Sequence, residues 1–469
     1  MTLSNHVPQS WRQSVSFVAL CLLLVGLFIA GGASRANVFG QVIIRAVAFG
    51  VLIAAIFAGT GTGTGTGIGT MRGGGRVPSL ILIGALVLAI SQLVPLPPAV
   101  WQSFPGRSLL AQAGTLAGQH QPWRPWSMVP GATFNSAASL VVPIAVLLVL
   151  AGLTDRERDR LPGLLLAVIC LHSLVGLLQF SDAGFNNPLV NDTMGQVSGM
   201  FANRNHFALL LAIGCMLAPV WGFMEPRQSF WRVPFAITLT SLFVLMILAS
   251  GSRAGLGLAA LALMLTGVMT WPQTKRLLRH FPRWTLPAAI GGVVILLGVP
   301  VLLSVTAGRA VSIARLFELD PGQDMRQRAL PTVFGMIGDY FPWGTGMGTF
   351  DPIFRIHEPN ALLKPSYFNH AHNDFLEIIL NAGIAGGLLL VASIGWWMWA
   401  SVAVWRGGGE QRFIFARLGS GILLLVCLAS VFDYPARTPI MMALIMIAAI
   451  WLGDGMDQRA ALPRRAPHI

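Results

Sequence analysis

The chain has 469 residues, of which 54% are hydrophobic and 10% are charged. A soluble domain carries about 25% charged residues, so this composition excludes an ordinary soluble protein. The mean hydropathy of +0.68 indicates a polytopic membrane protein. The net charge of +13 does not indicate a nucleic-acid partner, because the basic residues are scattered over short loops between apolar runs, which is typical of topology signals.

Apolar runs of about 20 residues are long enough to cross the ~30 Å hydrocarbon layer and therefore predict transmembrane helices. Such runs predict an all-α membrane protein with about twelve spans and a structured outer loop that carries short helices. The predicted spans are 14–30, 38–58, 77–96, 137–153, 161–180, 206–224, 233–250, 254–270, 286–305, 376–400, 418–431 and 439–452. An even number of spans places both termini on one side of the membrane. We expect the first run to be an uncleaved helix, because no clear A-x-A site follows it.

We expect three segments along the chain: N-terminal transmembrane helices at 1–160, a membrane core at 161–453 and a basic tail at 454–469. The alternating Gly-Thr tract at 59–67 is interpreted as a flexible linker. A phosphate-binding loop would need a Gly-Lys-Ser/Thr ending and a preceding strand, and the tract has neither.

The short loops that share a side with the N-terminus carry more arginine and lysine than those opposite, which predicts a cytoplasmic N-terminus. The long segments 97–136 and 307–375 then face outward, which in a bacterium is the periplasm. Within the second, helical spacing over 324–340 predicts a short helix lying on the membrane, with Leu330, Val333, Phe334 and Ile337 on one face.

Four polar groups fall on this predicted outer face. They are 199–206 with Arg204 and Asn205, 250–255 with Arg253, 324–328 with Arg326 and Arg328 before a Gly-rich stretch at 342–350, and 370–377 with His370, His372 and Asn373. Ionisable residues at a membrane boundary are expensive unless they face water or each other, so their clustering indicates a functional site.

Arginine offers a planar fork of donors that suits phosphate oxygens, and histidine titrates near neutral pH and can remove a proton from a hydroxyl. Together they predict glycosyl transfer from a polyprenyl diphosphate. The diphosphate is already a good leaving group, and cations absorb the charge that it develops.

Each residue also has a structural interpretation. Arg253 could extend to the lipid headgroups, and Arg204 could cap a helix or contact lipid phosphate. Arg326 and Arg328 could form the solvated face of a loop helix. His370 and His372 could bind a metal with Asp374 or Glu377, although the i, i+2 spacing without a third nearby histidine disfavours it.

Several motifs together resemble the O-antigen ligase and polymerase family of bacterial envelope glycosyltransferases, over about 161–400. They are Phe201-x-Asn203-x-Asn205, Gly251-Ser252-Arg253, an arginine ahead of Pro342-x-Gly344-x-Gly346-x-Gly348-x-Phe350, His370-x-His372-Asn373-x-x-Leu376-Glu377, and Gly383-x-x-Gly386.

This resemblance implies a multi-helix glycosyltransferase of the GT-C type in the bacterial inner membrane, acting at the periplasmic face without a metal, cofactor or nucleotide sugar. It implies transfer of glycan from undecaprenyl diphosphate to an acceptor hydroxyl, with inversion. A ligase would use lipid A core as acceptor, and a polymerase would use another lipid-linked glycan. No short motif separates the two.

The resemblance also implies roles for individual residues. His372 is the expected base, supported by His370. Arg253 and Arg326 are expected to hold the diphosphate, with Arg328 as the alternative to Arg326. Further expected substrate contacts are Arg204, Asn205 and Asn373.

The alternative function is a transporter or flippase of lipid-linked saccharide. Carriers place ionisable residues near the membrane midplane, often in broken helices. In this chain the best polar cluster lies at the boundary, and the deeper candidates are Arg45 and His172.

Overall fold

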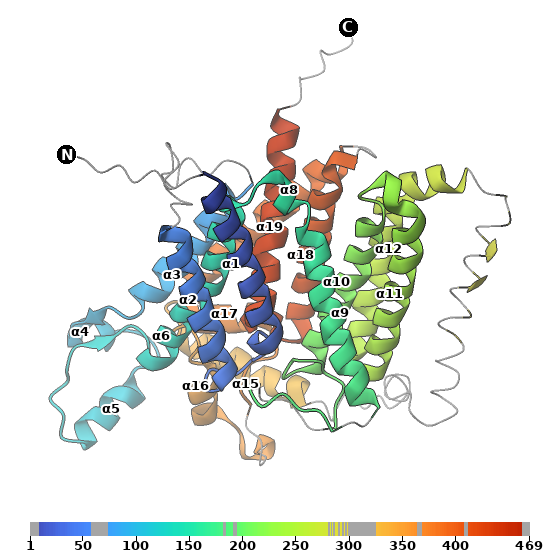
Figure 1. Cartoon of the computed structure of the whole chain (residues 1–469). Coiled ribbons are helices and arrows are strands. Elements are labelled where there is room, and N and C mark those ends of the chain that lie inside the picture. The colour runs from blue at the N-terminus through green and yellow to red at the C-terminus, as the bar shows by residue number, and fades with distance from the viewer. Residues whose placement is uncertain are drawn as a thin grey trace, which may run out of the picture.

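The structure is a computed structural model that describes residues 9–57, 74–181, 184–190, 195–279, 325–363, 368–407 and 411–461, with a few isolated positions between 282 and 298. It is an all-α, multi-pass membrane protein, as predicted. Figure 1 shows long helices side by side in one bundle, with α15 and α16 at one end and the short α8 at the other. The Gly-Thr tract at 59–67 lies outside the described residues, and so does most of the predicted span 286–305.

Within the described residues, nine helices are long and apolar enough to span a membrane, and two shorter apolar helices, Val15–Ala30 and Arg76–Ser91, accompany them. Each lies on a predicted span. The bundle helices are α1 (Gln9–Ala30), α2 (Phe39–Phe57), α3 (Arg76–Ser91), α6 (Pro130–Ser139) continued by α7 (Val141–Gly152), α9 (Leu161–Phe180), α10 (Arg204–Gly222), α11 (Ser229–Ser250), α12 (Arg253–Leu278), α17 (Asp374–Trp405), α18 (Ile414–Phe432) and α19 (Pro439–Ala460).

The bundle has two ends, which we name by the short helices found there. At the α15 face, Asn203 before α10 donates a hydrogen bond to Asp433 after α18, and Ser252 before α12 donates one to Asn205. The opposite end is the α8 face, where α1 begins and α19 ends (Figure 1). Helix ends that are distant in the sequence therefore meet at the α15 face.

The centre of the bundle is α10, in which nearly every residue is buried. Its sequence is rich in Ala, Leu and Gly, and small residues allow neighbouring helices to approach closely. Gly214, for example, lies against Phe243 of α11 and Ile169 of α9. One continuous hydrophobic core joins residues from α1 through α19.

Two loop regions extend the α15 face. One holds α4 (Pro98–Trp101), α5 (Ser108–Leu116) and the strands β1 (Pro95–Leu96) and β2 (Arg124–Pro125), which pair antiparallel. The other holds α15 (Met325–Tyr340), α16 (Phe350–His357) and the turn η4 (Asn360–Leu362). Remaining short elements are α8 (Asp155–Arg158), η2 (Pro226–Gln228), η5 (Gln411–Phe413) and η6 (Pro435–Arg437).

The predicted helix at 324–340 is confirmed as α15, but its predicted apolar face is partly wrong. The buried side carries Ala329, Val333, Met336 and Tyr340, which pack against α16 and the start of α17. Phe334 points outward and is 57% exposed. Large apolar residues near a membrane need not be buried in the protein, so apolarity alone did not determine which side of the helix is internal.

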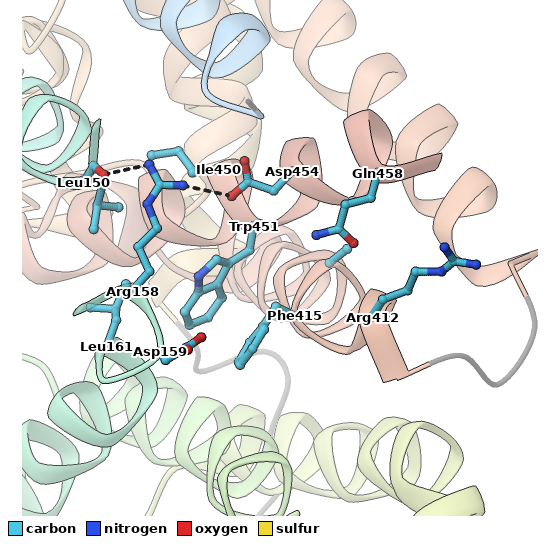
Figure 2. A pocket seen from close by; sticks show the side chains of 12 residues that line it. Leu150, Arg158, Asp159, Leu161, Arg412, Phe415, Ile450, Trp451, Asp454 and Gln458 are labelled. Carbon is cyan, nitrogen blue, oxygen red and sulfur yellow. Dashed lines mark hydrogen bonds and ion pairs between the residues drawn. The ribbon is translucent and has the colours of Figure 1, made fainter. Parts of the chain in front are cut away.

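The α8 face carries a small cavity of about 110 Å³ between α8, α18 and α19 (Figure 2). Arg158 donates a hydrogen bond of 3.0 Å to the Leu150 oxygen and lies 3.9 Å from Asp454. Asp454 also accepts a 2.7 Å hydrogen bond from the Gly74 nitrogen. These contacts connect Gly74, just before α3, to α19. The polar residues at this end therefore have a structural role.

Candidate active site

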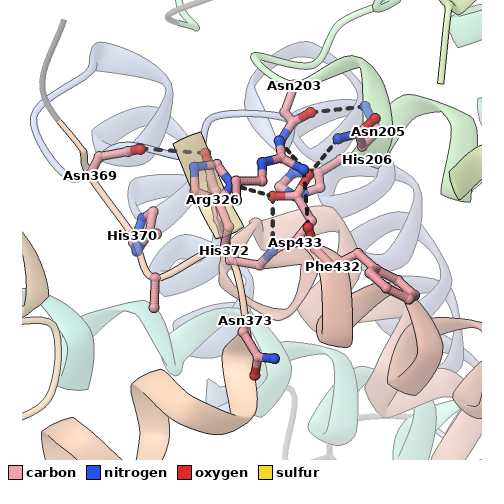
Figure 3. A network of polar contacts seen from close by, with 12 residues as sticks. Asn203, Asn205, His206, Arg326, Asn369, His370, His372, Asn373, Phe432 and Asp433 are labelled. Atoms are coloured by element: carbon pink, nitrogen blue, oxygen red, sulfur yellow. Dashed lines mark hydrogen bonds and ion pairs between the residues drawn. The ribbon is translucent and has the colours of Figure 1, made fainter. Parts of the chain in front are cut away.

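The centre of the candidate site is Asp433, the residue that follows α18 at the α15 face (Figure 3). Its Oδ1 atom lies 3.1 Å from Nδ1 of His372. Its Oδ2 atom accepts hydrogen bonds from Asn203, at 2.9 Å, and from Asn205, at 2.7 Å. Asp433 is 3% exposed, so the carboxylate is held by the protein and not by water.

Two basic side chains complete the surroundings of this carboxylate. Arg326 of α15 lies 3.7 Å from Oδ2 and also donates to the Phe432 oxygen at 3.1 Å. Nε2 of His206, in the first turn of α10, lies 3.8 Å from Oδ1. Burial alone would raise the pKa of Asp433, but the His372 hydrogen bond and the neighbouring positive charge hold it well below its usual value. Asp433 is therefore an anion at neutral pH.

His372 lies in the turn before α17 and has a positive φ of 51°, a left-handed conformation that non-glycine residues rarely adopt. Such a conformation costs about 1–2 kcal/mol and persists where the surrounding structure enforces it, often in active sites. Here the ring is packed at 5.0 Å from the ring of Tyr434 and 5.1 Å from that of Phe368, measured between centroids. Its orientation toward Asp433 is thus fixed by packing and by the hydrogen bond.

The protonation state of His372 follows from these contacts. Burial lowers the pKa of His372 below its ordinary value of 6.5, although the hydrogen bond with Asp433 acts in the opposite direction. A carboxylate can only accept, so Nδ1 of the neutral ring carries the proton and Nε2 keeps its lone pair. At neutral pH His372 is therefore able to accept a proton at Nε2.

His370 belongs to a second, neighbouring network. Its Nδ1 lies 3.0 Å from Glu377, which also accepts a 2.9 Å hydrogen bond from the Ala371 nitrogen. Arg437 of η6 lies 3.1 Å from Glu377 and 3.3 Å from Asp374. Both carboxylates are buried in the first turn of α17, so this network fixes the turn that carries His372.

The two histidines contact different carboxylates. His370 pairs with Glu377, whereas His372 pairs with Asp433. In the part of the chain that the structure describes, no three His, Cys, Asp or Glu side chains are grouped in a way that could hold a metal ion. Each histidine is thus oriented by its own carboxylate.

Beside Asp433 lies an open, polar cavity of about 270 Å³. It is bordered by the α1–α2 and α9–α10 loops, the first residues of α10 and α15, and the segments before α17 and after α18. Its lining residues are Ser34, Arg35, Gln196, Ala202, Asn203, Arg204, Asn205, Arg326, Asn369 and Tyr434. Three guanidinium groups thus border one water-accessible space, and none of its described lining residues carries a carboxylate.

Of the residues predicted from the sequence, Arg326, Asn205 and His372 are brought together around Asp433. Arg204 lines the cavity beside them. Asn373 instead caps α17, because its side-chain oxygen accepts from the Leu376 nitrogen at 3.0 Å. Its amide group donates to the Val431 oxygen.

Two predicted arginines lie outside the cavity lining. Arg328 donates to the Ala361 oxygen at 3.0 Å, away from Asp433. Arg253 is exposed in the first turn of α12, although its neighbour Ser252 contacts Asn205. The structure thus distinguishes Arg326 from Arg328, the two arginines that the sequence left as alternatives.

Sequence reasoning missed Asp433, Tyr434 and Arg35. Asp433 was recognisable as an acid directly after the apolar run 418–431, which is the same signal that identified the histidine cluster. Arg35 likewise follows the first apolar run by a few residues. Tyr434 carried no such signal. Burial raises its pKa, and its hydroxyl accepts a 3.4 Å hydrogen bond from Asn369.

The fold and this geometry define a multi-pass membrane protein with an oriented imidazole and an arginine-lined cavity at one end of its bundle. Residues 237–391 match the family model described as O-antigen ligase. The resemblance to the O-antigen ligase and polymerase family is thereby confirmed over this segment, and it supports a glycosyltransferase activity of that general type. The segment contains Arg326, His370 and His372. No curated protein matches the chain.

Proposed function

We propose that this protein transfers glycan from undecaprenyl diphosphate to an acceptor hydroxyl at the periplasmic face of the bacterial inner membrane, as an O-antigen ligase or a polysaccharide polymerase. The observation that carries the proposal is the 3.1 Å contact between His372 and Asp433, beside a cavity that is lined by Arg326. A base and a set of phosphate-binding groups are the two requirements of this reaction.

In the proposed step, the acceptor hydroxyl attacks the anomeric carbon of the donor sugar and its proton passes to Nε2 of His372. Asp433 stabilises the resulting imidazolium and keeps the ring in the correct orientation. The bond between the anomeric carbon and the diphosphate oxygen breaks, and the diphosphate leaves with the bonding electrons. Attack opposite the leaving group inverts the anomeric configuration.

The charge that develops on the diphosphate is assigned to the cavity arginines. Arg326, Arg204 and Arg35 border the same space, and guanidinium groups bind phosphate oxygens through paired hydrogen bonds. Because they supply positive charge directly, the proposal requires no metal ion or other cofactor. Arg253 is assigned a lesser role at the exposed edge of the site, where it would attract the donor.

The test is a transfer assay with purified protein and undecaprenyl-diphosphate-linked oligosaccharide, with and without lipid A core. A ladder formed without core identifies a polymerase, and a single transfer onto core identifies a ligase. We expect His372→Ala to reduce the rate by roughly 10²–10⁴-fold, the usual contribution of a general base. His357→Gln serves as the control, since His357 contacts Tyr340 and Asp339, at the end of α15 opposite Arg326.

Three outcomes would count against the proposal. Full activity of His372→Ala would reject the assignment of the base. Loss of wild-type activity on addition of chelator would show that a metal takes part. Movement of the lipid-linked saccharide across vesicles without any transfer would favour the transporter.

A further inference from the structure

The two ionisable residues expected deeper in the predicted spans, His172 and Arg45, have different surroundings. His172 of α9 is fully buried, with its ring centroid 5.1 Å from that of Phe28 and 5.0 Å from that of Phe201. It is a packing residue. Arg45 of α2 is only partly buried and has no place in the mechanism described above.

Arg45 lies at the border between the buried and the outward-facing sides of its helix. Of its four neighbours three and four positions away on the helix surface, two are buried, and the other two, Val42 and Phe49, are 63% and 48% exposed. Phe134, on the adjacent α6, is 67% exposed. Such apolar exposure on a spanning helix marks the surface that contacts lipid, so the guanidinium of Arg45 lies at the edge of a lipid-facing surface.

The guanidinium is held in place by neutral groups. It donates to the Asn135 side-chain oxygen at 2.6 Å and to the Gln41 side-chain oxygen at 3.2 Å. Within the described residues, no carboxylate pairs with Arg45, and its Nε has no hydrogen-bond partner. An arginine in this position is costly in a membrane unless an anion or water compensates its charge.

The depth of Arg45 matches the headgroup region of one leaflet. It lies six residues after Phe39, or about 9 Å along α2 at 1.5 Å per residue. Side chains on a helix tilt toward its N-terminus, which for α2 is the α15 face. A long arginine side chain can therefore reach the level of the lipid phosphates on that side.

Arg45 is also connected to the polar cavity. Gln41, which is 4% exposed, accepts from Arg45 and donates a 2.8 Å hydrogen bond to the Ala33 oxygen. The next two residues, Ser34 and Arg35, line the cavity. A short hydrogen-bonded path thus leads from the lipid-facing side of α2 to the arginine-lined space.

We propose that Arg45, oriented by Gln41 and Asn135, binds the phosphate of a membrane lipid beside the cavity, in the leaflet at the α15 face. The lipid is either a bulk phospholipid or, if the proposed function holds, a lipid-linked substrate that approaches the cavity sideways. Both present the same anionic oxygens to the guanidinium, and the experiment distinguishes them.

The experiment measures lipid binding by native mass spectrometry in a maltoside detergent, which contains no phosphate. The probes are phosphatidylglycerol and an undecaprenyl diphosphate without glycan. Because Arg45 offers the phosphate charge-assisted hydrogen bonds, we expect Arg45→Gln to weaken binding of its lipid by roughly 10- to 150-fold, or about 1.4–3 kcal/mol. Arg355→Gln is the matched control, because Arg355 on α16 is paired with Asp351.

The outcome identifies the lipid. Weakened binding of undecaprenyl diphosphate assigns Arg45 to the substrate path, and weakened binding of phosphatidylglycerol alone assigns it to a bulk lipid. Unchanged binding of both probes overturns the inference. Asn135→Ala keeps the charge of Arg45 but loosens the orientation of its side chain, so a smaller loss of lipid binding is expected. This variant provides the test if Arg45→Gln folds poorly.

The binding assay is independent of catalysis. If the wild-type protein transfers no glycan but the Arg45→Gln variant binds lipid more weakly than wild type, the proposed function fails and the Arg45 site remains. If transfer is observed and lipid binding is unaffected, the Arg45 site fails alone.

Discussion

His372 and Asp433 are 61 positions apart in the chain and meet through a 3.1 Å contact between Nδ1 and Oδ1. His372 precedes α17 and Asp433 follows α18, and these two helices are neighbours that run in opposite directions. Their adjacent ends therefore bring together a histidine and a carboxylate that no local motif connects. The same carboxylate contacts Arg326, so the proposed base and a proposed phosphate ligand share one anchor.

Replacing Asp433 with asparagine is expected to reduce the transfer rate by roughly 10²–10⁴-fold. The amide preserves the shape of the side chain but removes the negative charge that stabilises the His372 imidazolium. Its NH₂ group can also favour the wrong tautomer of the ring. The measurement is kcat in the transfer assay, with Asp351→Asn, on the exposed part of α16, as the control. A kcat within twofold of wild type would show that Asp433 is not needed to orient the base.

The pH dependence of the wild-type reaction follows from the lowered pKa of His372. A general base acts in its neutral form, so activity is retained above its pKa in the folded protein and lost as the pH falls through that value. Because burial lowers the pKa below 6.5, the rate should be constant from pH 7 upward and decline only at more acidic pH. In Asp433→Asn the loss of the anion lowers the pKa further, which shifts the acidic limb to lower pH. The profile of kcat/KM against pH measures the acidic limb of the wild type and of Asp433→Asn. A wild-type midpoint above pH 7 would contradict the assignment of His372 as the base.

Arg326 and Arg328 provide a matched pair on one helix. Arg326→Lys keeps the charge but loses the planar fork, so we expect a 10- to 100-fold rise in KM for the donor or an equal loss of kcat, about 1.4–2.7 kcal/mol. Arg328→Lys should change either value by less than about threefold, because Arg328 is exposed and contacts the Ala361 oxygen. Equal effects of the two substitutions would mean that proximity to Asp433 does not select the phosphate ligand.

The spans were predictable because the physical requirement is local. A helix that crosses lipid must be apolar over about 20 consecutive residues, and 161–180 is the same range in the sequence pattern and in α9. Short outer helices were harder to describe. The helix at 325–340 was recognised, but the exposure of Phe334 depends on which neighbours pack against α15.

The site was only partly predictable. The sequence points to His372, since clustered polar residues at a span end are costly without a role, and the motif before the Gly-rich stretch leaves Arg326 and Arg328 as alternatives. Asp433 and Arg35 join them through packing between helix ends, which no spacing in the sequence encodes. The Gly-Ser-Arg motif predicts a role for Arg253, yet its side chain is exposed while that of Ser252 turns inward. The direction of each side chain at a helix start is set by tertiary structure.

The buried network of His370, Glu377 and Arg437 leads to a prediction about stability. Glu377 is fully buried between His370 and Arg437, and Glu377→Gln would leave Arg437 paired with Asp374 alone. Removing one partner of a buried ion pair costs about 3–5 kcal/mol. We expect a clear fall in the thermal unfolding midpoint in detergent and a lower kcat, since the turn carrying His372 loosens. Asp351→Asn, which breaks the exposed pair with Arg355, should cost about 0–1 kcal/mol. Equal thermal unfolding midpoints for Glu377→Gln and Asp351→Asn would show that the buried network does not stabilise the fold.

The Gly-rich stretch after α15 packs closely against α17, and substitutions at two glycines of α17 can test this contact. Gly383 has φ of 54°, and a Cβ placed there would overlap the backbone oxygen of Pro342. Gly344 approaches the same part of α17 with φ of 77°, and its nitrogen donates to the Tyr340 oxygen at the end of α15. This close approach fixes α15, and therefore Arg326, relative to α17. Glycine is required at Gly383 because any side chain would separate the two backbones.

Gly383→Ala is accordingly expected to destabilise the protein by about 2–5 kcal/mol, the sum of left-handed strain and overpacking. Gly387→Ala is the control, since a Cβ at Gly387 meets nothing within 4 Å. In that variant a helical glycine becomes alanine, which should be neutral or stabilising by up to about 1 kcal/mol. Thermal unfolding compares the two variants, and KM for the donor reports whether Arg326 has moved. If Gly383→Ala unfolds at the wild-type temperature, the close approach of the Gly-rich stretch does not hold α15 against α17, and the placement of Arg326 must depend on its contacts with Phe432 and Asp433.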